Sequence, residues 1–162
     1  MEQLSIWVRN MAEKKEIRKY IFGKRKEFSQ QDAERYSEKI CETVISLPEF
    51  QEADCIYAYV DYNKEVVTKG MIEAAWKAGK RVAVPKVTGA HEMKYYYLES
   101  FEQLEPGYFQ IPEPAWGEEA KDEDAFLIVP GVAFDFQIVE EVPAEDTDIF
   151  PDKVITETRI IN

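Results

Sequence analysis

The strongest constraint on the fold is a stretch in which two short apolar segments flank one amphipathic helix. Residues 55–62 (CIYAYVDY) and 81–87 (RVAVPKV) are rich in β-branched and aromatic side chains, which is typical of buried strands. Between them a helix is predicted from a Thr68 cap through Ala78, and Gly79 stands where helices commonly end. Strand, helix and strand in this order form a right-handed crossover, so we expect the two strands to be parallel neighbours.

The rest of the chain also alternates between helices and strands. The pattern predicts helices over 12–27, from a Ser29 cap to about Leu47, and from Ser100 to Gly107, strands over 92–98, 125–134 and 153–157, and a loop over 111–124. The run 125–134 is the most apolar, so we expect a central strand buried on both faces, with 153–157 at an edge. We therefore expect a single α/β domain over residues 12–162, after an extension over 1–11. Its three layers would contain a mixed, mainly parallel sheet flanked by helices.

Composition excludes several classes of protein. The 162 residues are 45% hydrophobic and 32% charged, enough to build a core without disulfides, and disorder is not expected despite a net charge of −12. The acidic balance argues against nucleic-acid binding, and no apolar run approaches the ~18–20 residues that span a bilayer. Cys41 and Cys55 form no disulfide framework or metal motif. We expect a soluble, cytoplasmic monomer that binds neither nucleic acid nor membranes.

The charge is distributed unevenly along the chain. Residues 9–26 contain eight Lys and Arg against two Glu, whereas Lys121 is the only basic residue between Leu98 and Asp152. A basic segment on an acidic protein is a candidate seat for an anionic ligand. A solvated helix face is the alternative.

The sequence lacks the patterns of common catalytic and phosphate-binding sites. His91 is the single histidine and has no recognisable partner for nucleophilic or zinc chemistry. The chain contains no dinucleotide-binding or P-loop glycine motif, and no glycine follows Gly131. We therefore do not expect a cradle of backbone N–H groups for phosphate after the 125–134 strand, where such crevices lie in α/β sheets.

Several short motifs occur in a fixed order over nearly the whole chain from Lys14. They are K-x-x-x-R at Lys14 and Arg18, L-P-E-F at 47–50, Y-V-D-Y-N-K-E-V at 59–66, G-K-R-V-A-V-P-K-V at 79–87, I-P-E-P at 111–114, V-P-G-V-A-F-D at 129–135 and D-K-V-I-T-E at 152–157. Together they resemble the 5-formyltetrahydrofolate cyclo-ligase family, also called 5,10-methenyltetrahydrofolate synthetases. The resemblance implies cyclisation of 5-formyltetrahydrofolate to 5,10-methenyltetrahydrofolate with ATP and Mg²⁺, releasing ADP and phosphate.

The resemblance also implies roles for individual residues. Lys14 and Arg18 match the nucleotide-contacting pair, and their spacing of four residues puts them on one helix face. Three residues match folate-binding positions, namely Val60, Glu65 and Phe109. Asp148 matches a carboxylate assigned to magnesium. Without the resemblance, the charged residues among these would read as ordinary solvated side chains.

The chain departs from the family pattern after Asp135. In the family this motif leads into a glycine-rich loop, a helix and another strand, whereas here Phe136 and Gln137 follow directly. Three explanations of this gap stay open: a natural deletion at 135/136, an error of sequence assembly, or a segment omitted from the recorded chain. Separately, Met1 and Met11 are both candidates for the native start of the protein. Because the missing loop would carry phosphate-binding donors, the alternative function is a catalytically impaired folate- or nucleotide-binding module. A structural acidic partner protein is a third possibility.

Overall fold

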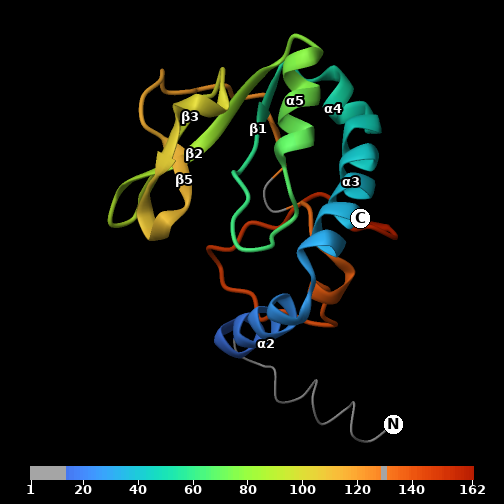
Figure 1. Cartoon of the computed structure of the whole chain (residues 1–162). Coiled ribbons are helices and arrows are strands. Elements are labelled where there is room, and N and C mark those ends of the chain that lie inside the picture. Colours follow the sequence, from blue (N-terminus) through green and yellow to red (C-terminus); the bar gives the residue numbers. More distant parts are fainter. Residues whose placement is uncertain (1–13, 129–130) are drawn as a thin grey trace, which may run out of the picture.

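The computed structural model describes residues 14–128 and 131–162, and a four-stranded sheet forms the centre of the fold (Figure 1). The strands are β1 (Cys55–Tyr57), β2 (Arg81–Gly89), β3 (Glu92–Tyr97) and β6 (Phe126–Leu127). Their order is β3-β2-β1-β6, in which β1 pairs in parallel with β2 and β6, while β2 and β3 are antiparallel. The predicted mixed, mainly parallel sheet is confirmed. The predicted extension over 1–11 lies outside the described residues.

Helices cover one face of this sheet (Figure 1). They are α3 (Gln30–Ser46), α4 (Pro48–Glu52) and α5 (Lys69–Lys77). Ile56 and Val82 point to the helices and join the main buried cluster, because successive strand residues face opposite sides. Tyr57 and Ala83 point the other way and pack with Ala120. The second face is therefore covered by non-helical chain around Ala120.

Local signals explain the position of α3. The Ser29 hydroxyl accepts a hydrogen bond from the Asp32 N–H at 2.9 Å and so satisfies one of the free donors at the start of the helix. Ala33, Ile40 and Val44 are buried at helical spacing. The prediction for this helix is confirmed.

The helix α5 is also confirmed, with one difference at its start. Gly79 follows the helix with φ +75°, a conformation that side chains other than glycine rarely adopt. Thr68 precedes the helix, but its hydroxyl does not cap it. That hydroxyl donates to the carbonyl oxygen of Tyr59 at 2.7 Å instead.

The predicted central strand over 125–134 is wrong. Within the described residues of this run, 125–128 and 131–134, only Phe126–Leu127 form a strand, at the edge of the sheet, and Leu127 is 53% exposed. Further along the run, Phe134 is fully buried and stacks with Phe136 at 5.7 Å between ring centroids. The apolar run reflects burial in the core, but burial alone does not specify a partner strand on each side.

The C-terminal strand also differs from the prediction. β7 (Val154–Ile155) pairs antiparallel with β8 (Ile160–Ile161) in a separate two-stranded sheet. Among the described residues, one parallel bridge, between Val132 and Ile155, connects this hairpin to the chain that follows β6. The β7–β8 hairpin is therefore linked to the chain beside the edge of the four-stranded sheet by a bridge rather than by a continuous strand pairing.

Three other predicted elements differ from the structure in length or in type. The predicted strand 55–62 ends at Tyr57, and the predicted helix from Ser100 to Gly107 is one 3₁₀ turn, η1 (Phe101–Gln103). Two further strands, β4 (Leu104–Pro106) and β5 (Pro112–Pro114), pair antiparallel, and β5 lies within the predicted loop. β5 packs beside β2.

The basic helix α2 (Lys14–Glu27) lies at the end of the molecule away from α4 (Figure 1). It contacts the 3₁₀ turn η3 (Asp135–Gln137). Just beyond the helix, Phe28 packs against Phe134 and Phe136, with both pairs of ring centroids 5.0 Å apart. The aromatic cluster thus attaches the junction of α2 and α3 to residues on both sides of Asp135. None of the helices in the described part combines the length and apolarity needed to cross a bilayer.

Candidate functional site

The chain after β1 forms a loop held by side-chain hydrogen bonds. The Tyr59 hydroxyl donates to the Val66 carbonyl oxygen at 2.7 Å, which closes the loop from inside. The backbone N–H of Thr68 donates to Asp61 at 3.0 Å, and the backbone N–H of Val67 donates to a buried hydroxyl of α3. These contacts fix the backbone between residues 59 and 68, which includes two predicted folate-binding positions.

A sharp turn in this loop brings it onto the end of α2. Asn63 and Lys64 have φ of +49° and +57°, the left-handed region that favours a tight reversal. The Lys64 ammonium donates to the Phe28 carbonyl oxygen at 2.6 Å. A cation beside carbonyls at a helix C-terminus is favourable, so Lys64 ties the loop to α2. The turn thereby places Glu65 next to Arg25.

Val60 and Glu65 line a cavity of about 350 Å³ between this loop, β2, β5 and α2. Most of its wall is apolar and is supplied by Val60, Val66, Pro85, Val87, Met93, Ile111, Pro112 and Val132. Its polar lining consists of Arg25, Tyr59, Glu65, Glu113 and Gln137. An apolar enclosure with a few polar groups is typical of a site for a small organic ligand.

Glu65 is the acceptor group at one end of this cavity. Its Oε2 accepts from the Tyr62 N–H at 3.1 Å, and its Oε1 lies 4.0 Å from Arg25 Nη1. Burial raises the pKa of Glu65, while the Tyr62 hydrogen bond and the Arg25 charge act against that rise. The carboxylate can therefore accept hydrogen bonds from donors on a ligand in a partly dehydrated setting.

Glu113 is a second, largely buried carboxylate in the wall. Its Oε1 accepts from the Val87 N–H at 3.2 Å, and a Cβ at Gly107 would collide with its carboxylate group. Lys86 anchors the same strand by donating to the Pro114 carbonyl oxygen at 2.7 Å. Glu113 is thus enclosed by its own strand and by β2.

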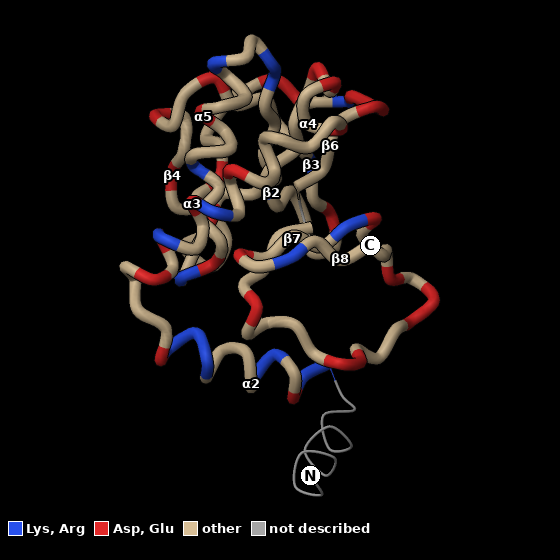
Figure 2. The backbone as a smooth tube through the Cα atoms, turned by 90° about the vertical axis from the view of Figure 1, so that its right-hand side faces the viewer, with Lys and Arg blue, Asp and Glu red and all other residues tan. Residues whose placement is uncertain are grey.

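Lys14 and Arg18 lie at the other end of α2 from the cavity. Lys14 and Arg25 are eleven residues apart, which is ~16 Å along a helix axis. Lys14 Nζ lies 2.6 Å from an Asp148 oxygen and 3.4 Å from Glu145, where the acidic chain before β7 passes α2 (Figure 2). The structure therefore brings the predicted nucleotide lysine and the predicted metal carboxylate together, but away from Val60 and Glu65.

Phe109 does not line the cavity. Its side chain is 75% exposed, its φ is +54°, and its ring packs on that of Tyr108 with centroids 4.4 Å apart. The nearby Ile111 and Pro112 line the cavity instead. Phe109 therefore lies in the turn before this part of the wall, and a role for it in binding a flat ring stays a prediction.

Arg25 was not singled out by the sequence. It belongs to the basic segment, and its spacing of eleven residues from Lys14 is close to three helical turns, so both lie on one helix face. That periodicity was the available signal. Its relation to Glu65 depends on the turn at Lys64, which no local pattern specifies.

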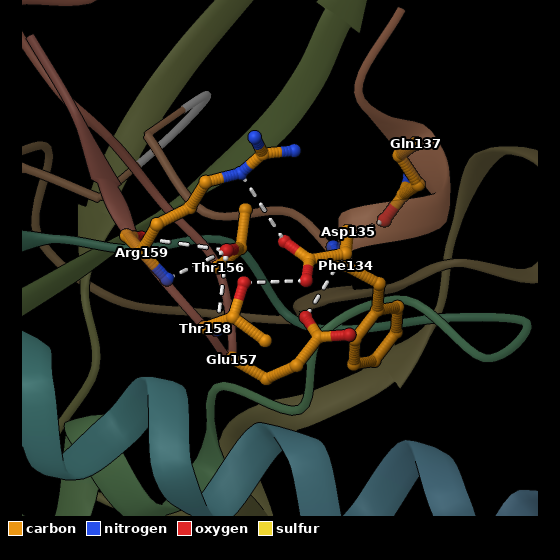
Figure 3. A network of polar contacts seen from close by, with 7 residues as sticks. All are labelled: Phe134, Asp135, Gln137, Thr156, Glu157, Thr158 and Arg159. Atoms are coloured by element: carbon orange, nitrogen blue, oxygen red, sulfur yellow. Dashed lines mark hydrogen bonds and ion pairs between the residues drawn. The ribbon is translucent and has the colours of Figure 1, made fainter.

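Asp135, directly before the predicted deletion point at 135/136, is held by a polar network with the C-terminal hairpin (Figure 3). The Asp135 N–H donates to Glu157 at 3.0 Å, the Thr158 hydroxyl donates to Asp135 at 2.5 Å, and Arg159 Nε lies 3.6 Å from the same carboxylate. Hydrogen bonds from Thr156 and Thr158, with the Arg159 charge, lower the pKa of Asp135. Beside it, Gln137 Oε1 accepts from the Phe134 N–H at 2.9 Å, and Gln137 lines the cavity.

Within residues 14–128 and 131–162, no three His, Cys, Asp or Glu side chains gather in a way that could hold a metal ion. Asp148 Oδ2 accepts from both Lys14 and the Glu145 N–H, at 2.6 and 2.8 Å. The described residues therefore do not form a ready magnesium site, and the role of Asp148 as a metal ligand stays a prediction.

Comparison with known proteins gives one consistent family. Residues 10–136 match the model of the 5-formyltetrahydrofolate cyclo-ligase family. A protein of Schizosaccharomyces pombe named as a probable 5-formyltetrahydrofolate cyclo-ligase is 40% identical over 103 residues, covering 59% of this chain and 50% of that protein. A Caenorhabditis elegans protein of the same name is 29% identical over 132 residues, covering 76% and 63%. The chain thus spans less than two thirds of either relative.

Solved structures show the same relationship. The NMR structure of Aquifex aeolicus 5,10-methenyltetrahydrofolate synthetase matches with a TM-score of 0.78 and 29% identity, over 90% of each chain. A 5,10-methenyltetrahydrofolate synthetase from Mycoplasma pneumoniae matches with a TM-score of 0.61 and 17% identity, over 87% of this chain and 96% of that one, which supports the fold alone.

Proposed function

This chain belongs to the 5-formyltetrahydrofolate cyclo-ligase family, and from that premise we propose that it binds 5-formyltetrahydrofolate and converts it to 5,10-methenyltetrahydrofolate at the expense of ATP. The observation that carries the proposal is the cavity beside α2 that Val60 and Glu65 line together. These are two of the three residues whose motif match implied folate binding, the third being Phe109. Monomeric state and cytoplasmic location stay predictions from the sequence.

The cavity suits the reduced pterin ring. Its apolar walls can enclose the flat bicycle, and Glu65 can accept hydrogen bonds from ring N–H donors. Because Glu65 is partly desolvated, such charge-assisted hydrogen bonds would be stronger than in water. Glu65 would therefore fix the orientation of the ring and, with it, the position of the formyl group.

The proposed reaction takes place in two steps. The formyl oxygen attacks the γ-phosphorus of ATP, so an O–P bond forms and ADP leaves. The neighbouring amine nitrogen then attacks the formyl carbon, a C–N bond forms, the activated oxygen departs as phosphate, and the amine proton passes to solvent. This chemistry depends mainly on positioning and charge neutralisation.

Lys14 and Arg18 are proposed to neutralise the polyphosphate. Arginine and lysine on one helix face can together contact several phosphate oxygens. Lys14 would exchange its exposed ion pair with Asp148 for the nucleotide. Because the described residues offer no ready cluster for a divalent cation, no step is assigned to a metal bound by the protein.

A folate-binding module without turnover is the second candidate, and one observation favours it. No glycine follows Gly131 in the sequence, so residues 132–162 offer no glycine-rich phosphate cradle. The family match also ends at residue 136, directly after the predicted join at 135/136. Loss of phosphate-binding donors would lower turnover by orders of magnitude while leaving the folate cavity in place.

Titration calorimetry and a turnover assay separate the two candidates. Binding of 5-formyltetrahydrofolate together with ATP-dependent formation of the methenyl product supports the enzyme. Binding of the folate without nucleotide binding or product supports the module. Failure to bind either ligand would contradict both and favour a structural role.

A further inference from the structure

Arg25 is a cationic side chain placed against the folate cavity by the last turn of α2. Its side chain is only 12% exposed, and its guanidinium group lies 5.4 Å from the centre of the Phe22 ring. Such stacking occupies one face of a guanidinium and leaves its N–H edges available. The side chain is therefore held in place without its donors being consumed.

The guanidinium of Arg25 has more donors than partners. An arginine carries five N–H donors, yet the nearest carboxylate oxygen, Glu65 Oε1, lies 4.0 Å away, beyond hydrogen-bond distance. Its Nε is buried and donates to no acceptor among the described residues. Buried donors without partners are rare in folded proteins, and a bound ligand is one way in which they become satisfied.

Arg25 is also the single basic side chain among the described residues that line the cavity. The neighbouring Lys64 is engaged by the Phe28 carbonyl oxygen. One end of the cavity therefore presents donors from Arg25 beside acceptor oxygens of Glu65. A ligand that matches this pair must carry an acceptor oxygen adjacent to N–H donors on one edge.

We propose that Arg25 is a specificity-determining residue that donates hydrogen bonds to the 4-oxo oxygen of the pterin, while Glu65 accepts from the adjacent ring N–H and 2-amino groups. This assignment rests on the proposed binding of 5-formyltetrahydrofolate. It extends that proposal by requiring a 2-amino-4-oxo ring. A 2,4-diamino ring carries an amino group in place of the 4-oxo oxygen, so its N–H donors would face the N–H donors of Arg25. Such a ring should therefore bind more weakly.

The test compares two ligands on four forms of the full chain. Titration calorimetry measures the dissociation constants of 5-formyltetrahydrofolate and its 4-amino-4-deoxy analogue, in alkaline buffer where the diamino ring is neutral. The proteins are wild type, Arg25→Met, Arg25→Lys and Lys24→Met. The Lys24→Met variant is the matched control because it also removes one positive charge from the last turn of α2. The Lys24 side chain is exposed and lies over Tyr20, and it does not line the cavity.

Wild type and Lys24→Met are expected to prefer the 4-oxo ligand by about 10- to 100-fold, the range for loss of a charge-assisted hydrogen bond. Arg25→Met should reduce that preference by about fivefold or more without abolishing it, because the neutral diamino ring also lacks the ring N–H that donates to Glu65. Arg25→Lys should leave an intermediate value, because its ammonium keeps the charge but not the fixed guanidinium geometry. If Arg25→Met does not fold, the intermediate ratio of Arg25→Lys decides. An unchanged preference in the Arg25 variants would overturn this role and leave the proposed function intact, whereas failure of wild type to bind either ligand would refute the folate site itself.

Discussion

The Lys14 ammonium lies 2.6 Å from the Asp148 carboxylate, so the cation predicted to contact nucleotide and the carboxylate predicted to bind magnesium neutralise each other. This ion pair shifts the pKa of both groups. The hydrogen bond with Asp148 raises the pKa of Lys14, and the same bond lowers the pKa of Asp148. A polyphosphate that binds Lys14 must compete with this carboxylate.

Replacing the carboxylate should therefore strengthen nucleotide binding. We expect Asp148→Asn to tighten ATP binding measured without divalent cations by about two- to fivefold, because exposed ion pairs are weak competitors. Asp146→Asn is the matched control, since Asp146 is a nearby exposed acidic residue without an ion pair among the described contacts. Weaker ATP binding, with loss of magnesium dependence, would instead support Asp148 as a metal ligand.

The two basic residues at the start of α2 should affect nucleotide more than folate. Joint replacement of Lys14 and Arg18 by Ala is expected to weaken ATP binding by about tenfold or more, because two charge-assisted contacts to phosphate are lost. The folate affinity should change little, since Lys14 and Arg18 lie ~16 Å and ~10 Å along the helix axis from Arg25, which lines the cavity. Calorimetry with each ligand checks this, and an equal loss of both affinities would count against the assignment.

The parts of the fold that could be predicted are those fixed by nearby residues. The Ser29 cap and the buried face of α3 are local signals, and Gly79 terminates α5 through its own backbone preference. The parallel pairing of β1 and β2 follows from the strand–helix–strand order. Tertiary context was not needed for any of these.

The errors arise where distant segments decide the outcome. The run 125–134 contains core residues such as Phe134, yet only two of its described residues pair as a strand at the sheet edge. An apolar segment is expected to be buried, but its sequence does not show how many strands pair with it. Likewise, Arg25 acquires its relation to Glu65 only because the left-handed turn at Lys64 returns the loop to α2.

The charge of Glu65, which we expect to serve folate binding, should lower the stability of the folded protein. Burial raises its pKa, so the native state holds the proton more tightly than the unfolded chain does. Stability contributed by this group is therefore greatest below its unfolded pKa and falls as pH rises through the higher folded pKa. Glu65→Gln removes the buried charge and is expected to raise Tm at neutral pH by roughly 1–2 °C, a modest shift because the side chain is partly exposed.

The same substitution should weaken folate binding. An amide cannot replace both charge-assisted contacts of the carboxylate, so we expect a loss of about tenfold or more in affinity for 5-formyltetrahydrofolate. In wild type, affinity should decline as pH falls through the raised pKa of Glu65, because the protonated carboxyl loses its acceptor charge. Thermal scans and titrations over a pH series measure both effects, and a variant that loses stability but keeps affinity would contradict this role.

Asp135 should be a stabilising residue at the predicted join. Its carboxylate accepts from Thr158 and lies 3.6 Å from Arg159, which links the chain after β6 to the β7–β8 hairpin. Its pKa is lowered by hydrogen bonding, so this stability is present above the unfolded pKa and is lost as pH falls through the lower folded pKa. We expect Asp135→Asn to lower the free energy of unfolding by about 1–2 kcal/mol at neutral pH, measured by urea denaturation. The exposed Asp146→Asn variant should change it by less than about 0.5 kcal/mol. Because the substitution removes a charge that matters only when ionised, the two variants should converge in stability with wild type in strong acid, and a gap that persists there would point to lost packing instead.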